Sequence, residues 1–401
     1  MRRFCTIAAA CAVCLSSVGS VLAAGDTIRL SVGAGDHDRV NTPVCVPVDA
    51  PAGAKSVTLT DVAGNPIPAQ LTAPGLLGDG ARGKSELHFV LPSLKRGESL
   101  RMEAAFSADP PPKGFAWKGV PDEYAELSLG NRPVLRYMCL KLTDANREDA
   151  FKVYHHLYNP AGTRLITKGP GGKYTHHRGL FFGYCQVTYG EGRRADTWSG
   201  RGTPETHAAF LADEAGPVLG RHLVEVDWQG SDKKPYLKEQ RELTVYNTPG
   251  GNLIEFASRL STTGGKVKLD GNAPHAGFQF RADQEVAEAS EKMTCYLRPD
   301  GKGQMGQARA KAFDLPWDAI SFVLEQNRYT VLYLDRPDNP KPAEYNERTY
   351  GRFGSIFRYE LDEGKDLRVR YRVWVQDGEM TVEEAAALHD DFVAPPAVTV
   401  R

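Results

Sequence analysis

Short segments in which apolar and polar residues alternate make up most of this chain, and they limit its fold more than any other feature. One face of a β-strand recurs at every second residue, so this alternation predicts half-buried strands. A dozen or more such runs follow residue 119, from AELSLG to LRVRYRVWV, without helical segments between them. That order argues against a parallel α/β fold. We therefore expect an all-β protein.

A proline-rich seam, ADPPPKGFAW, divides the strand-like runs into two groups. Consecutive prolines hold the backbone extended and are typical of spacers. The pattern predicts a small N-terminal β-sandwich over residues 24–108, a linker over 109–118 and a large unit over 119–401. The large unit is too long for an immunoglobulin-sized sandwich. Two large stacked antiparallel sheets, a super-sandwich, are expected instead, and the lack of a blade-length repeat disfavours a propeller.

A single helix is expected near the C-terminal end, in TVEEAAALHDDFV. Thr381 stands where an N-cap belongs, and Glu384 follows three residues later, which is the spacing of a capping box.

The first 23 residues have the pattern of a secretory signal peptide. Two arginines precede a short apolar stretch that ends in Val21-Leu22-Ala23, so we expect cleavage near Ala23 and a periplasmic or extracellular protein. A membrane anchor is the less favoured alternative, and no later stretch is long and apolar enough to span a bilayer.

Charge and cysteine content exclude some classes of partner. The 49 Lys and Arg residues nearly balance 50 Asp and Glu, so nothing favours nucleic acid. The cysteines beyond the leader lack C-x-x-C spacing, which disfavours a zinc ribbon. The sequence leaves open the oligomeric state and whether these cysteines form a disulfide. We interpret the cysteines as small buried residues. They are Cys45, Cys139, Cys185 and Cys295.

Histidines are the most informative residues, because seven of the ten lie between Phe151 and Arg281. Two of them stand beside an arginine in KYTHHRGLFFGYCQV, at residues 173–187. Three uses are open: a divalent metal site, acid–base catalysis, or the gripping of a hydroxylated ligand. No cofactor is expected, and a divalent metal is the less favoured alternative because no clean metal-binding spacing is present.

Loops and strand faces supply the other candidates. The loop RRADTWSGRGTPETH is polar around a Trp and is typical of a binding loop, unless Trp198 only plugs an opening between sheets. In HAGFQFR the polar residues alternate with apolar ones, so they line either a groove or the solvent. The candidate catalytic residues are His176, His177, His156, Asp196, His207 and Glu242. The candidate substrate-binding residues are Arg178, Trp198, Arg201, His275, Gln279 and Arg281.

Three stretches carry a family resemblance: SVGAGDHDRVNTPV, HHLYNPAGTRLITKGPGGKYTHHRGLFFGY and DRPDNPKPAEYNERTYGRFGS. They resemble the DUF6807 family of secreted bacterial proteins, over nearly the whole chain after the leader. Some members carry the name of a methane monooxygenase subunit, which is an integral membrane protein and does not fit a chain without spanning segments. The resemblance implies a galactose-mutarotase-like super-sandwich and a carbohydrate ligand, and it assigns no catalytic residue.

These observations lead to two functional hypotheses. The first is a secreted carbohydrate-active enzyme of hydrolase, lyase or epimerase type, acting on a sugar or an oxidised glycoside through His and carboxylate groups. The second is a non-catalytic carbohydrate-binding or scaffold protein. An enzyme should place His176 or His177 within hydrogen-bond reach of a carboxylate.

Overall fold

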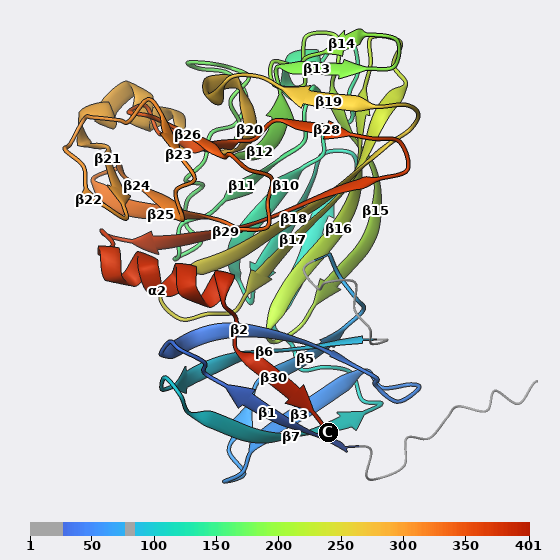
Figure 1. The fold of residues 1–401 in the computed structure, drawn as a ribbon, viewed down its shortest axis with the longest axis vertical. Coiled ribbons are helices and arrows are strands. Elements are labelled where there is room, and N and C mark those ends of the chain that lie inside the picture. The colour runs from blue at the N-terminus through green and yellow to red at the C-terminus, as the bar shows by residue number, and fades with distance from the viewer. Residues whose placement is uncertain (1–26, 77–84) are drawn as a thin grey trace, which may run out of the picture.

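The computed structural model describes residues 27–76 and 85–401, and the expected signal peptide lies outside this part of the chain. Two β-sandwiches stand one above the other, the smaller containing the N-terminal strands (Figure 1). The strand pairings are antiparallel throughout the described residues. The predicted all-β fold, with a small N-terminal sandwich, a large super-sandwich and a C-terminal helix, is confirmed.

The small sandwich consists of a five-stranded and a three-stranded sheet. In spatial order the first has β30 (Ala397–Val400), β1 (Thr27–Gly33), β7 (Ser99–Ser107), β3 (Ser56–Asp61) and β4 (Pro66–Ile67). The second has β2 (Arg39–Val48), β6 (Ser85–Leu94) and β5 (Ala69–Thr72). Alternate residues of both sheets form its core, which includes Leu30, Val46 and Phe89.

Two nine-stranded sheets stack to form the large sandwich. The first, which we call the β12 sheet, contains β23 (Ala312–Phe313), β26 (Glu344–Arg348), β27 (Arg352–Ile356), β20 (Ala276–Arg281), β12 (Leu180–Tyr184), β11 (Tyr154–Leu157), β10 (Arg132–Met138), β9 (Tyr124–Leu129) and β8 (Phe115–Val120). The second, the β17 sheet, contains β15 (Glu205–Ala215), β16 (Leu219–Gln229), β17 (Pro235–Tyr246), β18 (Asn252–Thr262), β29 (Asp366–Asp377), β25 (Asn327–Asp335), β24 (Trp317–Leu324), β21 (Cys295–Arg298) and β22 (Gly301–Lys302).

Smaller elements complete the large unit. A four-stranded sheet contains β14 (Arg193–Ala195), β13 (Gln186–Tyr189), β19 (Val267–Asp270) and β28 (Tyr359–Leu361). The helical segments are α1 (Arg147–Ala150), η1 (Ala273–His275), η2 (Val286–Ser290), η3 (Glu291–Met293) and α2 (Val382–Val393). None of the helices in the described residues is long and apolar enough to cross a membrane.

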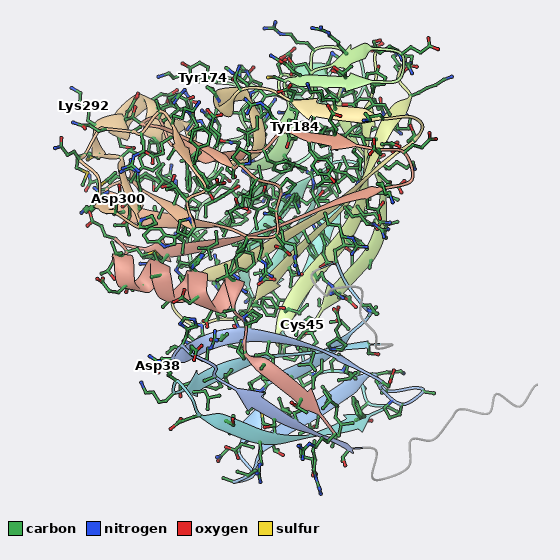
Figure 2. The ribbon with its side chains drawn as sticks, in the orientation of Figure 1. Asp38, Cys45, Tyr174, Tyr184, Lys292 and Asp300 are labelled. Atoms are coloured by element: carbon green, nitrogen blue, oxygen red, sulfur yellow. The ribbon has the colours of Figure 1, made fainter. Side chains whose placement is uncertain are left out.

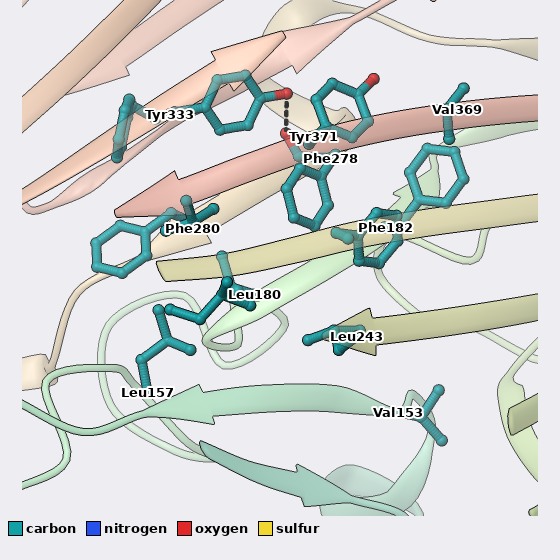
Figure 3. Close-up of a cluster of buried hydrophobic side chains, with 14 of the residues drawn as sticks. Val153, Leu157, Leu180, Phe182, Leu243, Phe278, Phe280, Tyr333, Val369 and Tyr371 are labelled. Carbon is teal, nitrogen blue, oxygen red and sulfur yellow. Dashed lines mark hydrogen bonds between the residues drawn. The ribbon is translucent and has the colours of Figure 1, made fainter. Parts of the chain in front are cut away.

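The core of the large sandwich lies between its two sheets, where aromatic and branched side chains interdigitate (Figure 3). Phe278 of β20 stacks on Phe256 of β18 with ring centroids 4.3 Å apart, and on Tyr371 of β29 at 4.7 Å. The Tyr333 hydroxyl donates to the Phe278 carbonyl at 3.4 Å, which satisfies a polar group inside this apolar layer. Stacked aromatics from both sheets therefore fix how the sheets face each other.

Helix α2 begins as the sequence predicts. The Glu384 amide donates to Thr381 Oγ1 at 3.1 Å, and the Thr381 amide donates to Glu384 Oε2 at 2.8 Å, so both bonds of the capping box are present. The helix packs near the junction of the two sandwiches, where Asp391 accepts from Arg39 of β2 at 2.8 Å.

Two of the expected domain limits differ from the structure. The sequence pattern predicts a linker that reaches residue 118, but β8 already begins at Phe115, because that side chain is buried in the core of the large sandwich. The pattern also predicts that the large unit runs to residue 401, but β30 returns to the small sandwich. There Val400 pairs with Leu30 of β1, so both ends of the described chain lie in one sheet.

Candidate functional site

The candidate site lies on the face of the β12 sheet that points away from the core. In β20, Ala276, Phe278 and Phe280 enter the core, whereas Gln279 and Arg281 point to the opposite face, as the alternation predicts. That face is neither an open groove nor solvent-exposed, because both polar residues are fully buried.

Residues 169–179 form a loop over this face and carry the His-His-Arg motif. Tyr174, labelled in Figure 2, has a positive φ of 58°, an unusual conformation for a residue other than glycine. Its ring centroid lies 5.0 Å from that of Tyr350 and 5.3 Å from that of His177. Strained backbone of this kind is concentrated at functional sites.

The two adjacent histidines differ in depth. His176 is half-buried, whereas His177 is 2 % exposed. Their rings meet edge to face at 4.3 Å, and His177 also stacks on Tyr350 and contacts the Trp198 ring at 5.6 Å. Neither ring nitrogen of His177 has a hydrogen-bond partner among the described residues, nor does His176 Nε2. These imidazoles are held by packing.

Arg352 lies at the centre of the face. Its Nη1 donates to Gln279 Oε1 at 2.8 Å, its Nη2 to Asn346 Oδ1 at 2.6 Å, and its Nε to the Tyr350 hydroxyl at 3.4 Å. All three acceptors are neutral, so the guanidinium keeps its full positive charge while burial lowers its pKa.

Two more buried arginines flank Arg352. Arg178 donates to the Glu148 carbonyl at 2.6 Å, and its guanidinium lies 5.1 Å from the Phe151 ring centroid. Arg281 donates to the Ala282 carbonyl at 2.8 Å, and burial lowers its pKa to about 10. Each keeps two guanidinium nitrogens without a hydrogen-bond partner among the described residues. Both therefore have unused donors inside the protein.

Two buried lysines complete the set. Lys152 donates to the Trp198 carbonyl and lies 4.6 Å from the centre of the Phe181 ring. Lys168 donates to backbone carbonyls that include Gly169 at 3.0 Å, and thereby anchors the start of the histidine loop. Burial lowers the pKa of Lys152 to about 7 and that of Lys168 to about 8.

We call Lys152, Lys168, Arg178, Arg281 and Arg352 the cationic cluster. Each member is at most 3 % exposed. Within residues 27–76 and 85–401, no carboxylate oxygen lies within 4.0 Å of any of their charged nitrogens. Buried charges are usually paired, because an unpaired charge loses its hydration without compensation. The cluster therefore holds positive charge that an anion would stabilise.

The same environment keeps the nearby histidines neutral. Burial, and then the positive charge of Lys152, lower the pKa of His176 to about 3. The pKa of His177 also lies well below its usual value, through burial and the charge of Arg352. Burial lowers the pKa of His156 to about 4. Burial and the charge of Arg352 also lower the pKa of His275, which is exposed.

Several predicted site residues do meet at this face. The Trp198 ring lies 6.2 Å from that of His275, and the His275 ring lies 6.5 Å from that of His176. Trp198 is only 1 % exposed, so it forms a wall of the site and not an exposed binding surface. Asp196 is half-buried and accepts from the Ser199 amide at 2.8 Å.

Three predicted residues lie elsewhere or only at the margin. His207 and Arg201 do not contact the cationic cluster through any described interaction, and Arg201 is exposed. Glu242 points from β17 toward the small sandwich and accepts from the Leu76 amide at 2.8 Å. Strand alternation places Glu242 and Arg241 on opposite faces, but it cannot show that the face carrying Glu242 is covered by another domain.

His207 instead belongs to a second histidine group. Its Nδ1 lies 3.2 Å from the Tyr137 hydroxyl, and Tyr137 stacks on His155 at 4.8 Å. His155 Nε2 lies 3.0 Å from His222 Nε2, and burial lowers the pKa of both, that of His222 to about 3. His207 and Phe210 also line a cleft of about 850 Å³ at the β10–α1 connection.

Sequence patterns do not identify Lys152, Lys168 and Arg352 as site residues. Arg352 stands between two glycines in YGRFG, at the start of a buried strand, and that pattern could have marked it. Lys152 and Lys168 carry no such signal. Each lies next to ordinary strand residues in the sequence, and each becomes buried only when loops cover it.

The fold and this site define a two-sandwich all-β protein with a buried cationic face. A family model described as a family of unknown function, DUF6807, matches residues 124–390. The chain belongs to the DUF6807 family. No match was found among curated proteins.

Similar solved structures come from carbohydrate-acting proteins. An α-mannosidase from Enterococcus faecalis aligns with 94 % of this chain at 7 % identity and a TM-score of 0.46, but the chain spans only 46 % of its length. A GH36 α-galactosidase from Geobacillus stearothermophilus aligns with 66 % of this chain and 41 % of its own, at 10 % identity and a TM-score of 0.34. A galactose mutarotase-related enzyme from Lactobacillus acidophilus aligns with 67 % of this chain and 98 % of its own, at 10 % identity and a TM-score of 0.30.

Proposed function

We propose that this chain is a secreted carbohydrate-active enzyme whose substrate is a sugar or glycoside carrying an anionic group, as an oxidised sugar does. The observation that supports the proposal is the cationic cluster, which has no carboxylate within 4.0 Å among the described residues. Arginine presents a planar fork of donors that matches a carboxylate, so Arg178 and Arg281 suit this role with their unused nitrogens. The aromatic walls suit the apolar face of a sugar ring.

His176 is the candidate base. With a pKa of about 3 it is neutral at ordinary pH, so its imidazole can accept a proton. An anion bound beside it would raise that pKa and strengthen the base. In this scheme the imidazole removes the proton on the carbon next to the sugar carboxylate, and the electron pair is delocalised into that carboxylate. The arginines stabilise the added charge.

The intermediate then has two outcomes. Expulsion of a leaving group from the neighbouring carbon is the reaction of a lyase. Return of a proton to the opposite face of the deprotonated carbon is the reaction of an epimerase. Both need a base and an anion clamp, and the epimerase also needs a proton donor on the opposite face of that carbon. Hydrolysis usually needs two opposed carboxyl groups, and no carboxylate within the described residues makes a hydrogen bond to His176 or His177. We therefore favour lyase or epimerase chemistry.

The expectation that an enzyme places His176 or His177 within hydrogen-bond reach of a carboxylate is not met among the described residues, and this favours a second candidate function. A non-catalytic carbohydrate-binding or scaffold protein needs the aromatic walls and the cationic cluster but no acid–base pair. Turnover decides between the two, since both predict binding of an acidic sugar.

Purified protein should be incubated with a panel of uronic acid glycosides, sugar phosphates and neutral glycosides, and the products followed by mass spectrometry and NMR. The proposal predicts turnover of at least one acidic glycoside, with a loss of at least tenfold in His176→Ala. His389→Ala, on helix α2, is the matched control and should keep full turnover. Binding without turnover would favour the scaffold function, and neither binding nor turnover of any acidic sugar would overturn the proposal.

Secretion is part of the proposal and rests on the leader at residues 1–23. Expression of the full chain in a bacterium, followed by N-terminal sequencing of the exported protein, tests it. The expected mature chain begins directly after Ala23, and an uncleaved cytoplasmic product would contradict the expectation.

A further inference from the structure

Three metal-ligating side chains meet at the junction of the two sandwiches. Cys45 of β2 pairs directly with His88 of β6, and Glu86 stands two residues before His88 on the same strand. Paired residues on adjacent strands share a face, as do residues two apart on one strand. Thiol, imidazole and carboxylate therefore point the same way, toward the large sandwich. Figure 2 labels Cys45 at this junction.

The distances between the donor atoms are compatible with one small cation. Cys45 Sγ lies 3.9 Å from His88 Nε2, which lies 3.3 Å from Glu86 Oε2, and all three atoms lie within 4.8 Å of one another. Tetrahedral zinc has bonds of about 2.0–2.3 Å, so its ligand atoms stand roughly 3.3–3.8 Å apart. A shift of about an ångström in the Cys45 and Glu86 side chains brings all three donor atoms within bonding distance of one zinc ion.

The surroundings of His88 orient its ring for this role. Nδ1 lies 3.1 Å from the hydroxyl of Tyr246, which belongs to the large sandwich. With Nδ1–H donating to that oxygen, Nε2 presents its lone pair to Cys45 and Glu86. Metal-bound histidines usually carry such a hydrogen bond on the other nitrogen. Thr72 Oγ1 lies 3.1 Å from Nε2 and is close enough to supply a fourth ligand atom, an oxygen.

The local charge also favours a cation. Glu86, at 2.9 Å, and Glu214 both pair with Arg221, and Glu242 also acts on it, so three carboxylates face one guanidinium. Both Glu86 and His88 are completely buried. Ionisation of the Cys45 thiol on metal binding adds a further negative charge, which a divalent cation offsets. Thiolate, imidazole and carboxylate together are the donors that zinc prefers.

We propose that Cys45, Glu86 and His88 form a structural site for a divalent transition metal, with zinc as the best match. All three ligands come from the small sandwich, and their supporting contacts, Tyr246 and Arg221, come from the large one. A bound metal therefore fixes the face on which the two sandwiches meet. This site is separate from the cationic cluster and does not depend on the proposed function.

The test uses cobalt as a spectroscopic probe of the full mature protein. Protein freed of metal with a chelator is titrated with Co²⁺, and absorption is recorded. Thiolate coordination gives a cobalt charge-transfer band in the near ultraviolet, which should saturate at one equivalent and disappear when Zn²⁺ displaces the cobalt. Zn²⁺ should also raise the midpoint of thermal unfolding.

Cys45→Ser is the informative variant, because Cys45 is only half-buried and serine preserves its shape. It should lose the band and the zinc-dependent rise in unfolding temperature, while circular dichroism confirms that it folds. Cys185→Ser, at a similarly half-buried position, is the matched control and should keep both. No saturable band in the parent protein, or a band that persists in Cys45→Ser, would overturn the proposal.

Discussion

Replacing Lys152 by methionine should make this protein more stable at neutral pH and weaken its binding of acidic sugars. The ammonium group is fully inside the protein, donates to the Trp198 carbonyl and has no carboxylate within 4.0 Å among the described residues. Methionine has nearly the same length and packs well against aromatic rings. The substitution therefore removes a buried charge with little change in volume.

The magnitude follows from the pKa. Burial lowers the pKa of Lys152 from 10.5 to about 7. Each pKa unit corresponds to about 1.4 kcal/mol, so burying the charge costs on the order of 5 kcal/mol at pH 7 and below. The lost hydrogen bond and ring contacts offset about 2 kcal/mol of that gain. We expect a net stabilisation of roughly 3 kcal/mol at pH 7.

The pH dependence gives the sign a second test. The unfolded chain binds a proton at Lys152 below pH 10.5, whereas the folded chain binds it only below about pH 7. The parent protein therefore loses stability as the pH falls from 10.5 to about 7. The net stabilisation in Lys152→Met should therefore reach zero near pH ~9, and the variant should be about 2 kcal/mol less stable than the parent above pH ~10.5, where only the lost contacts remain. Urea unfolding at several pH values measures it, with Lys55→Met, an exposed lysine, as control. A variant less stable than the parent at pH 7 would refute the reasoning.

Three further predictions concern other parts of the structure. His177→Ala should lower the free energy of unfolding by about 2–4 kcal/mol because it opens a cavity, whereas His176→Ala should cost less than about 1 kcal/mol, as measured by urea unfolding. His222, with a folded-state pKa of about 3, removes stability as the pH falls below 6.5; His222→Gln should flatten that fall by roughly 1.4 kcal/mol per pH unit in acid titrations of unfolding. Thr381→Ala should cost about 1 kcal/mol by removing the N-cap, and Thr381→Ser should restore it; equal thermal midpoints for the two variants would contradict the capping role.

Local patterns predicted the elements of this fold well. Alternation placed Phe278 in the core and Gln279 on the opposite face, and Thr381 marked the helix start, because both signals are read within a few residues. The return of β30 to β1 was missed. The four residues of β30 follow helix α2, and nothing in their local sequence marks the strand with which they pair. That strand is distant in the chain, since Val400 pairs with Leu30, 370 positions away.

The residues of the candidate site could be proposed from the sequence only in part, because only some of them lie in a distinctive local pattern. His176 and His177 stand out in the sequence, and loop packing brings them to Trp198 and His275. Charge burial is a property of the assembled fold, so the sequence could not show that Lys152 has no carboxylate within 4.0 Å among the described residues. Nor could it place Glu242 against the small sandwich.

The most direct test of the central claim compares two ligands that differ only in charge. Isothermal titration calorimetry should be performed with a methyl glucuronoside and the matching methyl glucoside, on the parent protein and on Arg281→Met. We expect the acidic sugar to bind at least tenfold more tightly, about 1.4 kcal/mol, with the difference shrinking in salt and in the variant. Equal affinity for the two sugars, or tighter binding of the neutral one, would contradict an anion-binding role for the cationic cluster.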